Sequence, residues 1–332
     1  MTPASSRARA PGATALALAA LALGCAVKEP VTPAERVGPA AEPDRARLEA
    51  GVRALAERFH PRDSTHVANL DAAAGWIRSE MERAGAAVTE QTWSAGGETY
   101  RNVVARIGPG GEERIVVGAH YDTCGPYPGA DDDASGVAGL LELARLLAAK
   151  PPPLAVELVA YSLEEPPYFG TPQMGSAQHA DSLAGAGVRV RAMLSLEMIG
   201  YFSDAPGSQS YLHFAPLGWL RSHPDRANFI AVVGNLGGEE LVRRVQRAMR
   251  AAGGPVPVES INAPGWMPGV DFSDHRSYWA RGFPAVMITD TAFLRNANYH
   301  EPSDTPETLD FARMAAVVAA VHEAVWALAS ER

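Results

Sequence analysis

Apolar positions along the chain follow two spacings, one typical of helices and one typical of strands. Between residues 67 and 84 they recur at every third or fourth position (Leu70, Ala74, Ile77 and Met81), which predicts an amphipathic helix. Short and almost wholly apolar runs, such as IVVGA, LAVELVAY and PAVMIT, predict strands that are covered on both faces. The predicted strands are 88–93, 100–107, 114–119, 155–162, 190–196, 229–233, 256–260 and 285–290. The predicted helices are 44–59, 67–84, 134–149, 174–184, 239–252, 272–280 and 306–330.

Alternating strands and helices predict the fold class. The pattern indicates one α/β domain, with a central, mostly parallel mixed sheet covered by helices on both faces. We expect this domain to span residues 44–332, because no internal repeat and no change of composition requires a second one.

The first 43 residues do not share this pattern. Arg7 and Arg9 precede an apolar run, 13–24, which ends at Cys25, and this layout predicts a secretory signal peptide over residues 1–24. The run is too short to span a membrane, and the small residues before Cys25 also fit a lipoprotein cleavage site. Residues 25–43 are rich in proline and alanine and predict a flexible linker. We therefore expect an exported protein, periplasmic, extracellular or attached to the cell envelope, whose only membrane contact is a lipid on Cys25.

Composition narrows the classes of partner. The 332 residues are 47% hydrophobic and 20% charged, as in ordinary globular proteins, and the formal net charge is -9. An acidic chain without a basic cluster argues against nucleic acid as a partner.

The stretch 118–136, GAHYDTCGPYPGADDDASG, contains one histidine and four aspartates but no lysine or arginine. Such closely spaced carboxylates repel one another unless a cation holds them. His120 and Asp122 follow a predicted strand, and Asp131 precedes a predicted helix. Cys124 could be a metal ligand or a nucleophile, but a small buried thiol is the simpler interpretation, because no second cysteine accompanies it.

Other polar residues follow the remaining predicted strands. Glu164 and Glu165 come after the strand 155–162, Glu197 follows 190–196, and Tyr299 and His300 lie beyond 285–290. Ligands of such sheets bind beyond the carboxyl ends of the strands, so we expect these side chains to meet at one edge.

Two imidazoles with several carboxylates suit zinc or a similar divalent ion. One zinc needs about three protein ligands, and more candidates than that remain when one carboxylate is set aside as a base, which favours two ions with a shared carboxylate. Asp122, two residues after His120, is expected to orient that imidazole. Of the adjacent pair Glu164 and Glu165, one can bind metal while the other accepts a proton from water.

Six motifs in order, HYD, GADDDASG, SLEEP, LSLEMIGY, SDHRSYW and YHEPSDT, resemble those of metallopeptidase family 28. This family holds co-catalytic di-zinc aminopeptidases and relatives such as glutamate carboxypeptidase and glutaminyl cyclase. The resemblance covers the chain from about residue 44 to its end.

The resemblance implies a role for each matching residue. His120 would bind the first zinc, Asp131 would bridge both ions, and Glu165 and His300 would bind the second zinc. Glu164 would be the general base.

Two further positions follow from the resemblance. Tyr299 resembles a tyrosine that stabilises the tetrahedral oxyanion in some members. Glu197 stands where the best-known members place an aspartate as the remaining ligand of the first zinc, and its extra methylene moves the carboxylate.

The function implied is that of a zinc-dependent aminopeptidase, which hydrolyses N-terminal residues from peptides with a free N-terminus through a metal-bridging hydroxide. Two alternatives differ in class: a glutaminyl cyclase of the same fold, and a catalytically silent relative that binds without turnover. A metal-dependent deacylase or carboxypeptidase also fits, because the metal motifs do not specify which end of a peptide enters.

Overall fold

The computed structural model describes residues 35–212 and 223–331. Its eight-stranded sheet has the order β1-β2-β4-β3-β5-β8-β6-β7. The strands are β1 (Ala87–Ala95), β2 (Glu98–Ile107), β3 (Glu113–His120), β4 (Ala155–Tyr161), β5 (Arg189–Glu197), β6 (Ile230–Gly234), β7 (Val258–Asn262) and β8 (Ala285–Thr289). The helices include α2 (Arg45–Arg53), α3 (Val67–Arg83), α4 (Gly136–Ala149), α5 (Gly175–Gly185), α7 (Glu239–Ala251), α8 (His275–Trp279) and α9 (Phe311–Ser330).

Four central strands, β4, β3, β5 and β8, run parallel to one another, and antiparallel pairs join them to β2 and β6. At the end of β3, His120 pairs with Tyr161 of β4, and at the end of β5, Glu197 pairs with Thr289 of β8. The carboxyl ends of all four strands therefore lie at one edge of the sheet. The predicted mostly parallel mixed sheet is confirmed.

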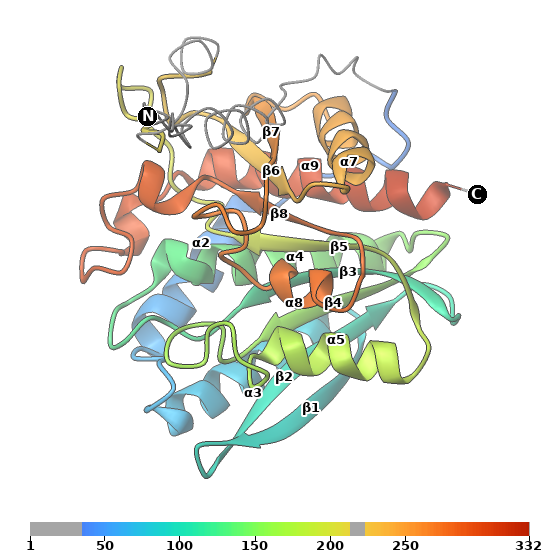
Figure 1. Ribbon diagram of the computed structural model, residues 1–332, viewed down its shortest axis with the longest axis vertical. Helices are drawn as coiled ribbons and strands as arrows, with labels where there is room; N and C mark the ends of the chain where they lie inside the picture. Colours follow the sequence, from blue (N-terminus) through green and yellow to red (C-terminus); the bar gives the residue numbers. More distant parts are fainter. Residues whose placement is uncertain (1–34, 213–222, 332) are drawn as a thin grey trace, which may run out of the picture.

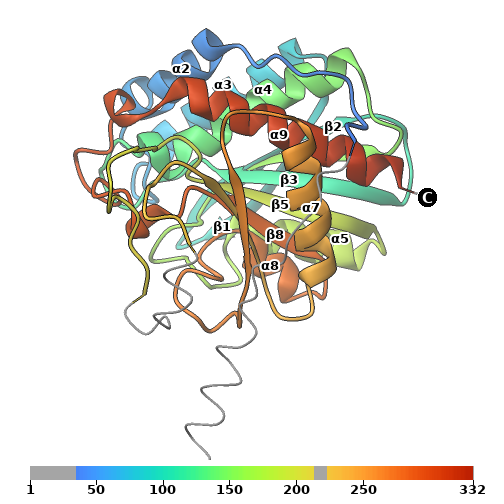
Figure 2. The ribbon, with the colours of Figure 1, turned by 90° about the horizontal axis from the view of Figure 1, so that it is seen from above.

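Helices cover both faces of this sheet (Figures 1 and 2). α2, α3, α4, α7 and α9 share one hydrophobic core with the sheet, while α5 and α8 form a second core on the opposite face. Central residues of the first core, such as Val117, Leu140 and Leu194, are fully buried. Each such side chain stabilises the fold by about 1.5–3 kcal/mol relative to an exposed position, so the two cores fix the strand ends that carry the site.

The helix α9 begins later than the sequence predicts. Residues Pro306–Thr308 form a short 3-10 turn, and the side chain of Asp310 then accepts hydrogen bonds from the N–H groups of Ala312 and Arg313, which caps α9. α9 is long and apolar enough to cross a membrane, but 61% of its most apolar part is buried inside the domain. Its apolar composition is that of a core helix.

The segment 35–43 has no helix or strand but contacts the domain. The backbone N–H groups of Val37 and Gly38 donate to Glu323 of α9, at 2.5 and 3.1 Å, and Arg145 of α4 donates to the carbonyl of Glu42. The predicted signal peptide, Cys25 and linker residues 25–34 lie outside the described residues.

Candidate metal and catalytic centre

The predicted site residues gather at the carboxyl edge of the central strands. His120 is the last residue of β3, Glu197 is the last residue of β5, and Glu164 and Glu165 follow β4 within a short turn. His300 lies on the segment between β8 and α9.

Backbone strain marks the same edge. Leu163, Met198 and His300 have positive φ angles of 61°, 52° and 56°, a region that non-glycine residues seldom adopt. Leu163 immediately precedes Glu164, and Met198 immediately follows Glu197. Strained residues of this kind cluster at functional sites, where the surrounding structure holds them.

Asp132 lies between the two histidines. Its Oδ1 is 3.2 Å from Nε2 of His120, and its Oδ2 is 3.0 Å from Nε2 of His300. Glu197 Oε2 lies 3.7 Å from the His120 nitrogen, and Glu165 Oε1 lies 3.2 Å from the His300 nitrogen. The four contacts form two groups of donors that share Asp132.

The orientation of His120 fits a cation between these donors. Its Nδ1 lies 3.2 Å from the carbonyl oxygen of Asp122, and because a carbonyl only accepts, Nδ1 donates there. Nε2 faces Asp132 Oδ1 and Glu197 Oε2, which are buried and have no hydrogen-bond partner within the described residues, so a metal ion that replaced the Nε2 proton would meet all three atoms. Donors about 2.1 Å from a tetrahedral ion lie about 3.4 Å apart, close to the distances found here, so the residues fit zinc.

Asp132, and not the expected Asp131, lies between the two histidines. The carboxylate of Asp131 turns away from both histidines and accepts hydrogen bonds from the N–H of Gly200 at 2.9 Å and from the amide of Asn296 at 2.8 Å. The sequence motif contains three successive aspartates, and the irregular turn around them, with non-helical backbone angles at Asp132 and Asp133, decides which one faces the histidines.

Asp133 and Asp304, which the sequence prediction did not assign, hold this turn in place. Asp133 accepts hydrogen bonds from the backbone N–H groups of His120 at 3.2 Å and of Met198 at 3.0 Å, so it ties the ends of β3 and β5 together. Asp304 accepts from the N–H groups of Asp131 at 2.9 Å and of Asp132 at 3.1 Å. Asp304 belongs to the motif YHEPSDT, but nothing in its spacing signals a contact with the acidic turn.

The acidic stretch 118–136 contains no lysine or arginine, and a buried arginine from outside it supplies a positive charge. The guanidinium of Arg62 is fully buried and donates to the carbonyl oxygens of Tyr121, Pro128 and Gly129 at 2.9, 3.0 and 3.1 Å. Arg62 thereby holds both ends of the loop that leads from His120 to the aspartates.

Asp122 lies beside His120 but makes its carboxylate hydrogen bonds elsewhere. Its Oδ1 is 3.6 Å from Nδ1 of His120, beyond hydrogen-bonding distance, and the backbone carbonyl of the same residue contacts the ring instead. Its two carboxylate oxygens accept hydrogen bonds from the N–H groups of Glu164 and Glu165, both at 3.1 Å. Asp122 therefore fixes the turn that presents the two glutamates.

Glu164 and Glu165 are both buried but face different histidines. Glu165 faces His300, whereas Oε2 of Glu164 lies 4.0 Å from Nε2 of His120. Burial raises the pKa of Glu164 well above its usual range, and the charges of Glu165 and Glu197 act in the same direction. Burial and the charge of Asp132 raise the pKa of Glu165 to about 7. A raised pKa makes an ionised carboxylate a stronger proton acceptor, which suits Glu164 to general-base catalysis.

Tyr299 stacks on one of the histidines. Its ring lies 3.8 Å from the imidazole of His300, with an angle of 21° between the planes. Burial and the charge of Asp132 raise the pKa of its phenol, so the hydroxyl stays protonated and remains a hydrogen-bond donor.

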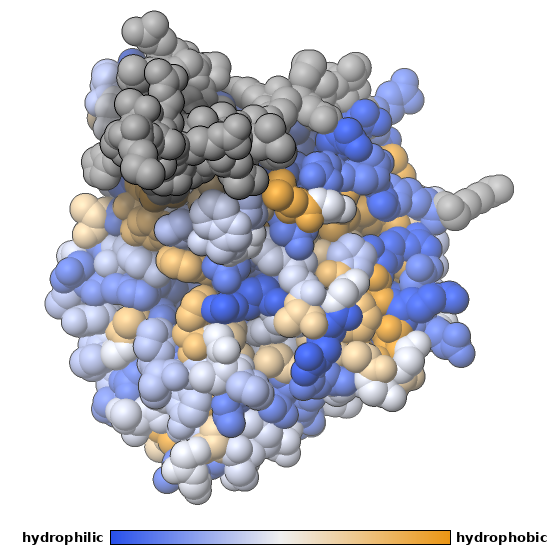
Figure 3. Space-filling view, viewed as in Figure 1, coloured by the Kyte–Doolittle hydropathy of each residue, from blue (hydrophilic) through white to orange (hydrophobic). Residues whose placement is uncertain are grey.

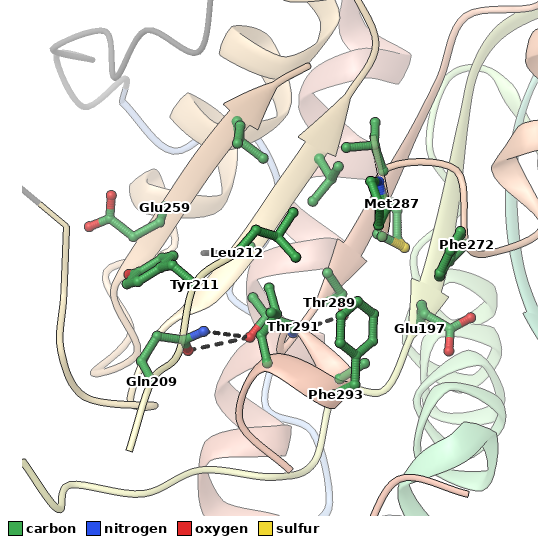
Figure 4. A pocket seen from close by; sticks show the side chains of 18 of the residues that line it. Glu197, Gln209, Tyr211, Leu212, Glu259, Phe272, Met287, Thr289, Thr291 and Phe293 are labelled. Atoms are coloured by element: carbon green, nitrogen blue, oxygen red, sulfur yellow. Dashed lines mark hydrogen bonds between the residues drawn. The ribbon is translucent and has the colours of Figure 1, made fainter. Parts of the chain in front are cut away.

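An apolar pocket of about 170 Å³ opens beside Glu197 and Tyr299. Figure 4 shows Glu197 beside Phe272 on one side, with Gln209, Tyr211 and Glu259 on the other. Most of the other side chains on its wall are apolar and include Phe229, Val233, Ile261, Met267, Met287 and Phe293. The surface in Figure 3 carries patches of hydrophobic residues between hydrophilic ones, and two of the exposed large hydrophobic residues, Phe272 and Phe293, belong to this pocket.

Three comparisons agree with this geometry. The sequence model described as "Peptidase family M28" matches residues 102–325. The uncharacterized protein YfbL of Escherichia coli (strain K12) is 48% identical over 280 residues, which cover 82% of this chain and 84% of the relative.

Solved structures share the fold. A zinc aminopeptidase from Bacillus subtilis is similar with a TM-score of 0.68 and 16% identity, over 87% of this chain and 95% of that one. A glutaminyl cyclase from Bacteroides thetaiotaomicron is similar with a TM-score of 0.66 and 20% identity, over 89% of this chain and 100% of that one. At these identities the likeness concerns the fold alone.

Proposed function

Because the chain belongs to peptidase family M28, we propose that it is a metal-dependent aminopeptidase that removes residues from the free N-terminus of peptides. One observation carries the proposal: Asp132 directs one carboxylate oxygen to each of two histidines. A carboxylate that faces two imidazoles in this way supports two metal positions that share it.

The first position would be held by His120, Asp132 and Glu197, and the second by Asp132, Glu165 and His300. Two zinc ions bound there would lower the pKa of water and polarise a substrate carbonyl. The longer side chain of Glu197 reaches to 3.7 Å from Nε2 of His120, which supports it as a ligand in place of the aspartate of other members.

Two residues would handle protons and charge. Glu164 would accept the proton of the attacking water and pass it to the leaving amine, since its carboxylate is buried, lies 4.0 Å from His120 and contributes to neither group of ligands. Tyr299 would donate a hydrogen bond to the oxygen that becomes negatively charged in the tetrahedral intermediate. Its protonated phenol and its place against His300 support this role.

The apolar pocket supports a preference for hydrophobic N-terminal side chains. Its wall carries Phe272, Met287 and Phe293, and Glu197 at its edge belongs to the proposed first metal position. A substrate carbonyl near the metals would therefore direct its N-terminal side chain into an apolar environment, where burial contributes about 25 cal/mol per Å².

Mass spectrometry of a defined peptide pool tests the proposal. The pool would contain matched peptides with free, N-acetylated and glutamine-initiated termini, incubated with the full chain in the presence of zinc or of a chelator. We expect stepwise shortening of the free peptides only, fastest for N-terminal leucine, methionine and phenylalanine, and abolished by the chelator.

Two other results would redirect the assignment. Loss of ammonia from the glutamine peptides without shortening would replace the aminopeptidase by a glutaminyl cyclase, the activity of one similar structure. A pool that stays unchanged in the presence of bound zinc would favour a binding relative without turnover.

A further inference from the structure

Cys124 lies beside the second metal position of the proposed centre. Its Sγ, a carboxylate oxygen of Glu165 and a ring nitrogen of His300 all lie within 4.8 Å of one another. Cys124 is the one cysteine among the described residues, and it belongs to the loop between β3 and the acidic turn. Around an ion shared with Asp132, these atoms would be adjacent donors.

A small cavity lies beside Cys124 and His300. It has a volume of about 10 Å³ and is lined by Cys124, Asp132, His300 and Asp304, among others. That volume is enough for a single water molecule or ion. Asp132, which is only 4% exposed, borders this cavity, and its Oδ2 faces His300 at 3.0 Å. A buried carboxylate, an imidazole and a thiol around a space of this size form a donor set that suits a zinc-like cation.

We propose that Cys124 is a ligand of the second metal ion, in addition to Asp132, Glu165 and His300. This inference rests on the metal centre of the proposed function. On binding, the thiol loses its proton to solvent and a bond forms between Sγ and the ion. A thiolate is a soft ligand, so this position would favour zinc, cadmium or cobalt over magnesium and manganese, unlike a position built only from carboxylates and imidazole.

The neighbouring first position differs in this respect. Its donors, from His120, Asp132 and Glu197, contain no sulfur. The two positions of the centre would therefore differ in metal preference, and the thiolate would belong to the His300 side alone. The sequence alone favours a structural thiol, because no second cysteine accompanies Cys124. In the fold, however, Cys124 lies next to a histidine and a carboxylate that are distant in the sequence.

The absorption spectrum of the cobalt-substituted full chain tests this assignment. A cobalt–thiolate bond gives a charge-transfer band in the near ultraviolet, whereas histidine and carboxylate ligands give only the weak visible bands of the ion. We expect this near-ultraviolet band in the native chain. The band should be lost in Cys124→Ser, which keeps the size of the side chain but removes the sulfur, and the visible bands should remain. Cys25→Ser, which removes the only other cysteine, is the matched control and should keep the ultraviolet band.

The outcomes separate this inference from the proposed function. Visible bands without a thiolate band in the native chain, or a thiolate band that persists in Cys124→Ser, would overturn the ligand assignment and leave the metal centre intact. Absence of any cobalt binding would overturn the centre itself.

A second measurement does not depend on the folding of a variant. Peptide mapping after treatment of the native chain with iodoacetamide should show Cys124 alkylated in the chelated protein and protected when zinc is bound. Protection by manganese as complete as that by zinc would contradict a soft thiolate ligand.

Discussion

Oδ2 of Asp132 lies 3.0 Å from Nε2 of His300, although Asp132 precedes β4 in the sequence and His300 follows β8. The same carboxylate faces His120 through its other oxygen, and Asp304 accepts a hydrogen bond from its backbone N–H. The centre is thus built around one aspartate whose backbone and side chain are both held from the segment after β8.

The first prediction compares Asp132→Asn with Asp131→Asn. An amide has only one acceptor oxygen, so Asp132→Asn should lose bound metal and reduce hydrolysis to background. Asp131→Asn should keep the metal, because the carboxylate of Asp131 contacts Gly200 and Asn296 rather than either histidine. Metal content by mass spectrometry distinguishes the two variants, and a normal zinc content in Asp132→Asn together with a loss in Asp131→Asn would reverse the assignment.

Replacing the proposed base separates metal binding from turnover. Glu164→Gln removes a proton acceptor but no proposed ligand, so zinc content should stay unchanged while kcat falls by about 10²–10⁴. Glu165→Gln, the adjacent control, should instead weaken binding at the second position, because Glu165 lies 3.2 Å from His300. Near-normal turnover by Glu164→Gln would show that another group takes the proton.

Asp122 should affect catalysis through the turn that carries the two glutamates. Asp122→Ala leaves the N–H groups of Glu164 and Glu165 without their acceptors, at a cost of about 1–3 kcal/mol in the free energy of unfolding for each buried group. Thermal unfolding measures this loss, and the fall in kcat should exceed any rise in KM. Asp122→Asn, which retains one acceptor oxygen, should recover part of both, and an equal effect of the two variants would argue against the hydrogen bonds as the cause.

The stabilising effect of metal should depend on pH. In the metal-free fold, burial and the charge of Asp132 raise the pKa of Glu165 to about 7. Between the usual pKa of a glutamate and about pH 7, folding is therefore coupled to the uptake of a proton by Glu165. The contribution of protonated Glu165 to the free energy of unfolding is present at low pH and is lost as the pH rises through this range. For His120, burial alone would lower the pKa, but contacts with Asp122 and Asp132 raise it, and this shift has the same sign.

Zinc binds the deprotonated ligands, so at higher pH it binds more tightly and stabilises the fold where the metal-free protein becomes less stable. The rise in Tm produced by zinc should therefore grow from about pH 5 to about pH 8. Thermal unfolding with and without zinc across this range measures the difference, in which titrating groups remote from the centre cancel. A zinc effect that shrinks as the pH rises would contradict the ligand assignment.

The sequence predicts the order of strands and helices well, because apolar periodicity reports burial directly. The predicted strand 114–119 corresponds to β3, and the apolar run 285–290 corresponds to β8. The start of α9 is less accurate, because a proline and two threonines precede the true cap at Asp310, and only the hydrogen bonds of that cap distinguish it.

The candidate site is predicted in outline but not in its contacts. Strand ends place His120, Glu164, Glu165 and Glu197 at one edge, since parallel strands share a direction. The orientation of a carboxylate within an irregular turn depends on local backbone angles, which is why the sequence indicates Asp131 where the structure places Asp132.

Contacts between distant segments are also absent from the pattern. Asp304 accepts from the backbone of the acidic turn, and Arg62 donates to the loop that precedes it. Neither hydrogen-bonding contact corresponds to a residue spacing that can be recognised in a single sequence.

Anomalous scattering at the zinc edge from crystals of the zinc-loaded full chain tests the central claim most directly. We predict two peaks on either side of the Asp132 carboxylate, one next to His120 and Glu197 and the other next to Glu165 and His300. A single peak would contradict the two-ion centre, and a pair of peaks bridged by Asp131 would contradict the shared role of Asp132.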